Sequence, residues 1–554
     1  MDVVKPHKCG LIFQVILIAI PILIYVWYIY KFGVNVPFVD DWLIVDLYRS
    51  LYSHQININN FWLFHNGHRL FFPKILFLAI SYFTKLNIKI MMYVSFAFLT
   101  GSFYLIFLFY KKLHNNLWFF VPVSWILFSW VQWEDTLWGY QLAWYMILFF
   151  TLLTFYFLEN LTAHKSFIIL SIISAIIASY SSLQGLIVWP SGVFFIIMKI
   201  EDRKNKSLWQ KIFYLWMVTG IFSIFIYLYG FNFQDAQGSS IFYFLYHPLN
   251  TINYFLSSAG AVIVRNPNKL MEYIPKVLGP IGIKYFNSIN AIVDFVTVAL
   301  ILLFFFYIVF AVFSFLRLRN KNKDVLYFLL ILYGVLFDLL TLVGRSHFGV
   351  AEAFSSRYTL YNLLLFVGVY FVLLSMHENT KAQNCNNRFE ALLFKLFFIL
   401  ILIQIILSFP YGIYQGKLRR DRCNLDANSI LFYETLKDPA ILAMEQNDLD
   451  DTSLMSFLRD KHLSLFTQPR SFRLFASYIK VIDQYPKYKQ AIDNLFKIYL
   501  TNFDLQNKYS YTDKDFVEKL IIWAVNTGVK TNTFVQELVP FTDQYKELIK
   551  KMQS

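Results

Sequence analysis

Cysteine and charged residues are both scarce in this chain. The three cysteines, Cys9, Cys385 and Cys423, lie far apart in 554 residues, which excludes a metal site built on closely spaced thiolates. Charged residues make up 15% of the chain and hydrophobic residues 57%, more than a soluble globular protein of this length needs. Long uncharged runs recur as far as residue 411, so the sequence predicts a protein that crosses a membrane many times.

Positive charges outnumber negative charges by 14, but their distribution argues against binding of nucleic acid. Much of the Lys and Arg falls in short clusters between hydrophobic runs, as the positive-inside rule expects. The remainder is mixed with Asp and Glu after residue 411. We therefore expect the N-terminus in the cytoplasm, together with the clusters at 111–112, 165, 199–211, 317–323 and 381–395.

About eleven helices of membrane-spanning length are predicted from the apolar runs. The first run lacks a small-residue cleavage site and is followed by further spans, so we interpret it as a retained helix. Segment 231–289 is ambiguous, because it fits a re-entrant or interfacial element as well as two extra crossings. The predicted spans are 11–30, 88–110, 117–132, 139–158, 166–181, 184–199, 211–230, 290–316, 325–343, 357–376 and 391–411.

The remaining polar segments are expected on the outer side of the membrane. The first of them, 31–87, has the pattern of two short interfacial helices. From 412 to 554 the sequence is polar with helical periodicity, which predicts a small soluble helical domain after a transmembrane domain at 1–411. The fold class is thus all-α. Only Cys423 would lie outside, so no intrachain disulfide is expected.

Paired carboxylates, Asp40 and Asp41, follow the first span directly and precede Trp42. One of them fits the N-cap of the helix that follows, but a cap needs only one carboxylate. Ionisable residues at a membrane edge are functional candidates, so the pair also fits a general base that deprotonates an acceptor hydroxyl.

Further along the same segment, His65, His68 and Arg69 precede the second interfacial helix. Donors of this kind at a helix N-terminus suit a phosphate group. Contact with lipid headgroups explains them equally well, and two histidines are a thin basis for a metal site.

Two arginines, a histidine and a tyrosine flank the expected outer segment 344–356: Arg345, His347, Arg357 and Tyr358. Positive residues on the outer side run against the insertion rule, and arginine side chains match phosphate oxygens. Snorkelling at helix ends is the alternative.

Aromatic side chains near carboxylates and amides suit the faces of sugar rings, although an interfacial aromatic belt has the same composition. The candidates for lining a substrate site are Trp42, His65, Glu134, Asp135, Trp138, Gln141 and Trp189.

These features together resemble the GT-C-type membrane glycosyltransferases. The matching parts are Asp40–Asp41, the helical segment 42–87 and the polar tail 412–554. The motifs Asp-Asp-Trp, His-Asn-Gly-His-Arg, Trp-Gly-Tyr-Gln, Gly-Leu-Ile-Val-Trp-Pro and Gly-Arg…Ser-Arg-Tyr also resemble a group of bacterial multi-span proteins.

The resemblance implies an inverting enzyme that transfers a sugar from a polyprenyl-phosphate or pyrophosphate donor to a glycan or lipid of the cell envelope, such as lipopolysaccharide. Asp40 or Asp41 would then be the base, and Arg345 and Arg357 would neutralise the leaving phosphate. Some members of the family use a divalent cation, Mg²⁺ or Mn²⁺, for which this chain has no clear ligand set. The expected location is the bacterial inner membrane, with the tail in the periplasm. An O-antigen polymerase or ligase and a flippase for a lipid-linked glycan are the alternatives.

Overall fold

The computed structural model describes most of the chain as helix. The described residues are 8–201, 205–231, 243–263, 286–317, 321–382, 388–433 and 451–484, with Pro486, Lys489 and Asp493. They contain no β-strand, and the expected all-α class is confirmed for them.

Nine helices in the described part of the chain are long and apolar enough to cross a membrane. Multiple apolar helices of this length make the chain a multi-pass membrane protein by composition. Seven of them are the single helices α1 (Lys8–Phe32), α5 (Ile88–Lys111), α11 (Lys206–Leu228), α16 (Phe286–Arg317), α17 (Lys321–Arg345), α19 (Thr359–Ala382) and α20 (Arg388–Leu431). The other two are continuous with a preceding 3-10 turn: η3 (Gly139–Gln141) with α8 (Leu142–Glu159), and η4 (Leu183–Ile187) with α10 (Val188–Glu201), which together span Leu183–Glu201 with 19 residues.

Two of the eleven expected spans do not form helices of spanning length. Segment 117–132 is divided into η1 (Leu117–Phe119), α6 (Val121–Leu127) and η2 (Trp130–Gln132). Helix α9 (Phe167–Ser179) has 13 residues, about 20 Å at the usual helical rise, which is short of the hydrocarbon thickness. The count of eleven spans is therefore not confirmed.

Side-chain hydrogen bonds explain how the backbone is interrupted near residue 130. The Ser129 hydroxyl accepts from the Val131 N–H, and the Gln132 amide donates to the Leu127 carbonyl at 2.6 Å. From α20, the Gln404 amide donates to Ser129 at 2.8 Å. Irregular backbone at membrane depth is tolerated where protein buries it and satisfies its polar groups, and Ser129 and Gln132 are both fully buried.

The chain divides into two compact units, which we describe separately. The membrane unit comprises 1–33, 57–77 and 90–417, and the Asp40 unit comprises 34–56, 78–89 and 418–554. Helices α4 (Phe71–Thr84) and α20 contribute residues to both. The expected boundary at 411–412 falls inside α20, and residues 494–554 of the expected soluble domain lie outside the described residues.

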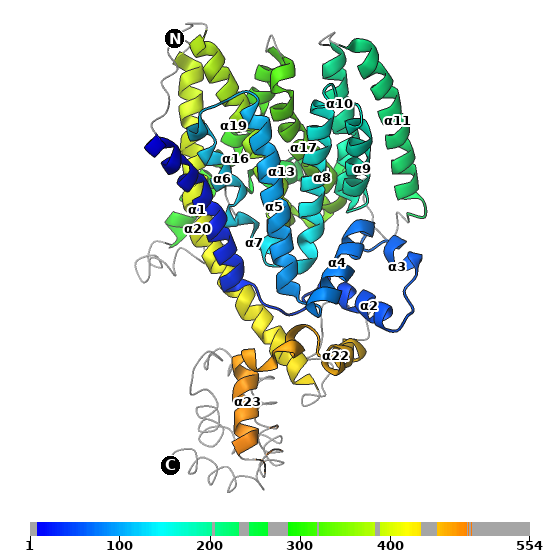
Figure 1. Ribbon diagram of the computed structural model, residues 1–554. Helices are drawn as coiled ribbons and strands as arrows, with labels where there is room; N and C mark the ends of the chain where they lie inside the picture. Colours follow the sequence, from blue (N-terminus) through cyan, green and yellow to red (C-terminus); the bar gives the residue numbers. More distant parts are fainter. Residues whose placement is uncertain are drawn as a thin grey trace. The chain divides into compact units, whose positions relative to one another are not determined.

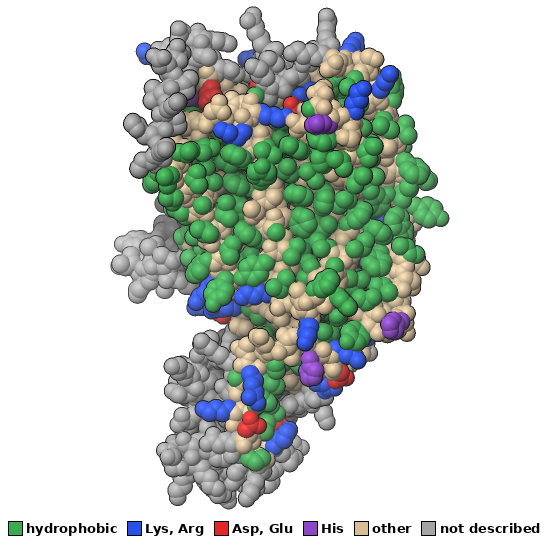
Figure 2. All heavy atoms as spheres, in the orientation of Figure 1, with side chains coloured by type: hydrophobic (Ala, Val, Ile, Leu, Met, Phe, Trp, Pro, Cys, Tyr) green, Lys and Arg blue, Asp and Glu red, His purple; other side chains and the backbone are tan. Residues whose placement is uncertain are grey.

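In the membrane unit the long helices run side by side, as Figure 1 shows for α5, α8, α10, α17 and α19. Hydrophobic side chains form a broad band across this unit in Figure 2, and Lys and Arg gather along its upper edge in that view. On α11 five large apolar side chains are 61–69% exposed, as expected for contact with lipid: Tyr214, Val218, Ile221, Phe222 and Phe225.

The ambiguous segment after α11 contains α12 (Tyr243–Tyr246) and α13 (Pro248–Gly260). With 13 residues, α13 is too short to span, yet its second half is buried against α16, α17 and α19. Its approach is close, because a Cβ on Gly260 would lie 2.5 Å from the Ile301 side chain. It is a short helix packed inside the bundle, and residues 264–285 after it lie outside the described part.

Candidate active site

In the Asp40 unit, the two adjacent carboxylates have different surroundings. Asp41 is the first residue of α2 (Asp41–Tyr52), is 1% exposed, and accepts a hydrogen bond from the Phe38 N–H at 3.1 Å. Asp40 precedes the helix, is partly exposed, and makes no side-chain capping bond. Asp41 thus fixes the turn before α2, while Asp40 is accessible at the helix N-terminus.

Arginines of α20 lie against the same turn. The guanidinium carbon of Arg419 is 3.3 Å from the centroid of the Phe38 ring, and that of Arg422 is 5.0 Å from it. Asp41, Arg419 and Arg422 all act electrostatically on the thiol of Cys423, so opposite charges surround this one side chain. The turn therefore combines a carboxylate pair with a cluster of guanidinium groups.

Our sequence reasoning missed these arginines. The run Leu-Arg-Arg-Asp-Arg at 418–422 comes soon after the last predicted span, 391–411, on the expected outer side, where basic residues run against the insertion rule. Basic residues on the expected outer side are also the feature that singled out Arg345 and Arg357. It was lost because the run was interpreted as the start of a separate soluble domain.

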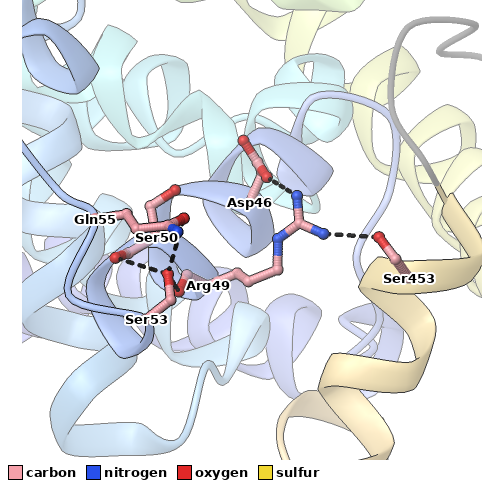
Figure 3. Close-up of polar contacts among 6 residues, drawn as sticks. All are labelled: Asp46, Arg49, Ser50, Ser53, Gln55 and Ser453. Atoms are coloured by element: carbon pink, nitrogen blue, oxygen red, sulfur yellow. Dashed lines mark hydrogen bonds and ion pairs between the residues drawn. The ribbon is translucent and has the colours of Figure 1, made fainter.

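Polar contacts hold α2 in place within the unit. Arg49 donates to Asp46 at 2.6 Å and to Ser453 of α22 (Asp451–Asp460) at 2.7 Å, and Figure 3 shows its guanidinium between them. Trp42, a predicted lining residue, is 2% exposed on α2 and forms part of the core.

In the membrane unit, His65 to His68 form a tight turn. The backbone N–H of each histidine donates to the carbonyl of the other, at 2.9 and 2.8 Å, and Asn66 and Gly67 have φ of 48° and 77°. Positive φ at both central positions is typical of a type I′ turn, for which Asn-Gly is the preferred pair. The His68 ring contacts the Ser182 hydroxyl at 3.0 Å, and the His65 ring lies against Tyr140.

Arg69 follows this turn and is 2% exposed. Its guanidinium donates to the carbonyls of Tyr227, Trp62 and Tyr229, and the rings of Trp62 and Phe64 cover it at 4.3 and 3.8 Å. Burial lowers the pKa of Arg69 from its usual value. Three of its donors are thus used by the protein, which leaves little of this side chain for a phosphate.

A second cation, Lys74 on α4, has a similar position. It is 4% exposed and donates to the carbonyls of Asn60 and Leu63 at 2.8 and 3.1 Å. Burial, and to a smaller extent the charge of Arg69, lowers the pKa of Lys74 to about 8. Together Arg69 and Lys74 fix the segment that carries the two histidines.

A polar cluster joins residues 134 and 352–358 in the membrane unit. Glu134 accepts from the Ser355 hydroxyl at 3.3 Å, and its backbone N–H donates to the Ser356 hydroxyl. Arg357 forms an ion pair with Glu352 at 2.5 Å, and the Tyr358 phenol donates to the same carboxylate at 2.9 Å. Arg357 therefore already has a carboxylate partner.

Two other candidates in this region surround Phe348. The guanidinium carbon of Arg345 is 5.7 Å from the Phe348 ring centroid, and the His347 ring lies 4.0 Å from the same ring. Both side chains are partly exposed at the end of α17.

Four further candidates are buried: Asp135, Trp138, Gln141 and Trp189. Trp189 belongs to the core, because its indole N–H donates to Ser179 at 2.9 Å and its ring lies against Trp216. Asp135 is fully buried, and Trp138 lies 6.3 Å from Tyr140, the ring that contacts His65.

The structure thus places the His65 ring against Tyr140, two residues after Trp138, and it joins Glu134 to the segment that carries Arg357 and Tyr358. Asp40, Asp41 and Trp42 belong to the other unit. Among the described residues, no group of three or more His, Cys, Asp or Glu side chains could hold a metal ion.

The fold defines an α-helical multi-pass membrane protein. Its candidate residues lie in two regions, the turn before α2 in the Asp40 unit and the polar segments of the membrane unit. Comparisons with protein-family models, with curated proteins and with solved structures found no match.

Proposed function

We propose that this protein is a GT-C-like inverting glycosyltransferase of the bacterial inner membrane. It transfers a sugar from a polyprenyl-phosphate or pyrophosphate donor to a glycan or lipid of the cell envelope. The N-terminus is cytoplasmic and the reaction takes place on the periplasmic side. The observation that supports this best is the turn before α2, where accessible Asp40 adjoins a carboxylate and guanidinium groups lie against Phe38.

In this proposal Asp40 is the base. It takes the proton from an acceptor hydroxyl, whose oxygen bonds to the anomeric carbon as the bond to the donor phosphate breaks. Asp41 positions the turn, since it is buried and accepts the Phe38 N–H. Arg419 and Arg422 stabilise the charge on the leaving phosphate, because guanidinium groups pair well with phosphate oxygens.

The residues of this turn do not suit a divalent cation. Asp41 already accepts a backbone hydrogen bond, and guanidinium groups would repel Mg²⁺ or Mn²⁺. We therefore derive no step through a metal.

The membrane unit carries candidate substrate contacts of its own in our proposal. His68, Arg345 and His347 are candidates for donor phosphate, whereas Arg357 and Tyr358 share Glu352 and Arg69 is used by backbone carbonyls. Glu134 and His65 are partly exposed and suit sugar hydroxyls.

A transfer assay in membranes tests this function. Radiolabelled polyprenyl-phosphate sugars are supplied to membranes with wild-type protein or with Asp40→Asn, Arg422→Ala, or the control Asp46→Asn, at matched amounts of folded protein. Loss of a positioned base lowers the rate by about 100-fold or more, so Asp40→Asn should be nearly inactive. Asp46→Asn, on the same helix, should keep close to wild-type transfer because its partner Arg49 also bonds Ser453.

Three results would reject the proposal. The first is wild-type membranes that consume none of the donors, and the second is undiminished transfer by Asp40→Asn. The third is labelled lipid that changes leaflet without being consumed, which would establish the flippase alternative.

A further inference from the structure

A buried carboxylate lies where the short helix α13 ends inside the membrane unit. Asp338 of α17 is fully buried and accepts a hydrogen bond from the Ser258 hydroxyl at 2.7 Å. Ser258 is in the last turn of α13, whose carbonyl ends form the negative pole of the helix. A carboxylate here faces the partial negative charge of the helix end at a buried position.

Other oxygen atoms converge on this carboxylate. The Asn362 side chain of α19 lies beside Asp338 and donates its N–H to the Ser258 carbonyl at 2.6 Å. Tyr254, one turn before Ser258 on α13, is fully buried and lies within electrostatic reach of Asp338. Three helices therefore contribute oxygen-bearing side chains at one point.

Several of these atoms lack a partner among the described residues. They are the second carboxylate oxygen of Asp338, the amide oxygen of Asn362 and the phenol oxygen of Tyr254. Buried polar atoms in native proteins nearly always have a hydrogen-bond or metal partner, so the unsatisfied oxygens of the adjacent Asp338 and Asn362 side chains suit a bound ligand.

The neighbouring charges do not supply a counter-ion. Helix α13 carries no charged residue, and the part of α19 around Asn362 carries none. On α17 the nearest cation is Arg345, two turns further along; it acts electrostatically on Tyr254, and no described ion pair joins it to Asp338. Glu352 of α18 (Val350–Ala353) adds another negative charge near Tyr254.

We propose that Asp338, Ser258 and Asn362 bind one sodium ion at the C-terminal end of α13, with Tyr254 as a further oxygen ligand. A hard cation of charge +1 balances the single carboxylate, and hydroxyl, amide and carboxylate oxygens are its preferred ligands. A divalent ion would leave one positive charge without a carboxylate in this buried site, which is costly. Broken helices place C-terminal carbonyl ends toward sodium in the same way.

Binding of radioactive sodium to the purified full-length protein tests this site. We expect saturable binding of one ion that potassium and choline compete for poorly. Asp338→Asn keeps the side-chain shape but removes the charge and should weaken binding by about tenfold or more. Ser258→Ala should also weaken it, which covers the case that Asp338→Asn does not fold. The control Ser191→Ala removes another buried hydroxyl, on α10, and should bind sodium as wild type does.

Sodium should also raise the melting temperature of the wild type at constant ionic strength, because a ligand that binds only the folded state stabilises it. Absence of saturable binding at every pH tested would overturn the proposal. The unsatisfied carboxylate oxygen of Asp338 would then be explained by a protonated side chain. Wild-type affinity in both Asp338→Asn and Ser258→Ala would overturn it as well. Neither result depends on glycosyl transfer.

Discussion

Replacement of Arg69 by alanine separates a structural from a substrate-binding role for this residue. The variant removes every donor to the carbonyls of Trp62 and Tyr227 and opens the space between the Trp62 and Phe64 rings. Because Arg69 is 2% exposed, solvent cannot replace most of these contacts. We therefore expect segment 57–70 to unfold more readily in the variant than in the wild type.

The magnitude follows from the contacts. A buried carbonyl left without a donor costs about 1–3 kcal/mol, and two such carbonyls give about 2 kcal/mol at the lower end of that range. The Tyr229 carbonyl is left out of the sum because its residue is 71% exposed and water can reach it. Loss of the contacts with two rings adds about 1 kcal/mol, so the total is about 3 kcal/mol.

Denaturant unfolding of the purified protein in detergent, with proteolysis of segment 57–70 as a local readout, measures this loss. The control is Arg459→Ala, since Arg459 is 36% exposed and pairs with its neighbour Asp460. A surface pair of this kind contributes about 0.5 kcal/mol or less. If Arg69→Ala were as stable as the control and yet inactive, the structural role would be refuted and phosphate binding by Arg69 would be supported.

Three further predictions concern other positions in the membrane unit. Gly185→Ala should prevent normal folding, because a Cβ there would lie 1.8 Å from the Ala178 carbonyl oxygen. The control is Gly344→Ala, since a Cβ at Gly344 would have no neighbour within 4 Å. The yield of monodisperse protein measures both effects. The pKa of Lys74 is about 8 in the folded protein and 10.5 in the unfolded chain. Between these two pH values the unfolded chain binds more protons, so the free energy of unfolding should rise with pH. Lys74→Met should abolish the corresponding rise in melting temperature. Glu352→Gln removes the ion pair of Arg357 and should lower the free energy of unfolding by about 1–2 kcal/mol, and an unchanged denaturation midpoint would contradict this.

Local sequence patterns predicted much of the architecture. Apolar runs gave helices at most of the expected positions, because hydropathy over a window of about 20 residues is a local property. The helix after Asp41 was likewise visible in the local pattern of apolar residues. Hydropathy also marked 117–132 and 166–181, although neither forms a helix of spanning length.

The environment of each candidate depended on contacts between distant segments. Arg69 was predicted to bind phosphate from its place before a helix, but its partners Tyr227 and Tyr229 lie about 160 residues away. Arg419 was overlooked because only the folded chain places it on Phe38, far earlier in the sequence.

The sequence by itself determined that this is a helical membrane protein with its ionisable residues collected between apolar runs, because lipid excludes charge and unpaired backbone wherever they occur in a chain. Tertiary structure alone decided which carboxylate is buried and which is accessible, and which arginine already has its partners. It also decided that Asp338 meets the end of α13. Burial and hydrogen bonding depend on what packs against a side chain, and in a bundle those neighbours come from helices far apart in sequence.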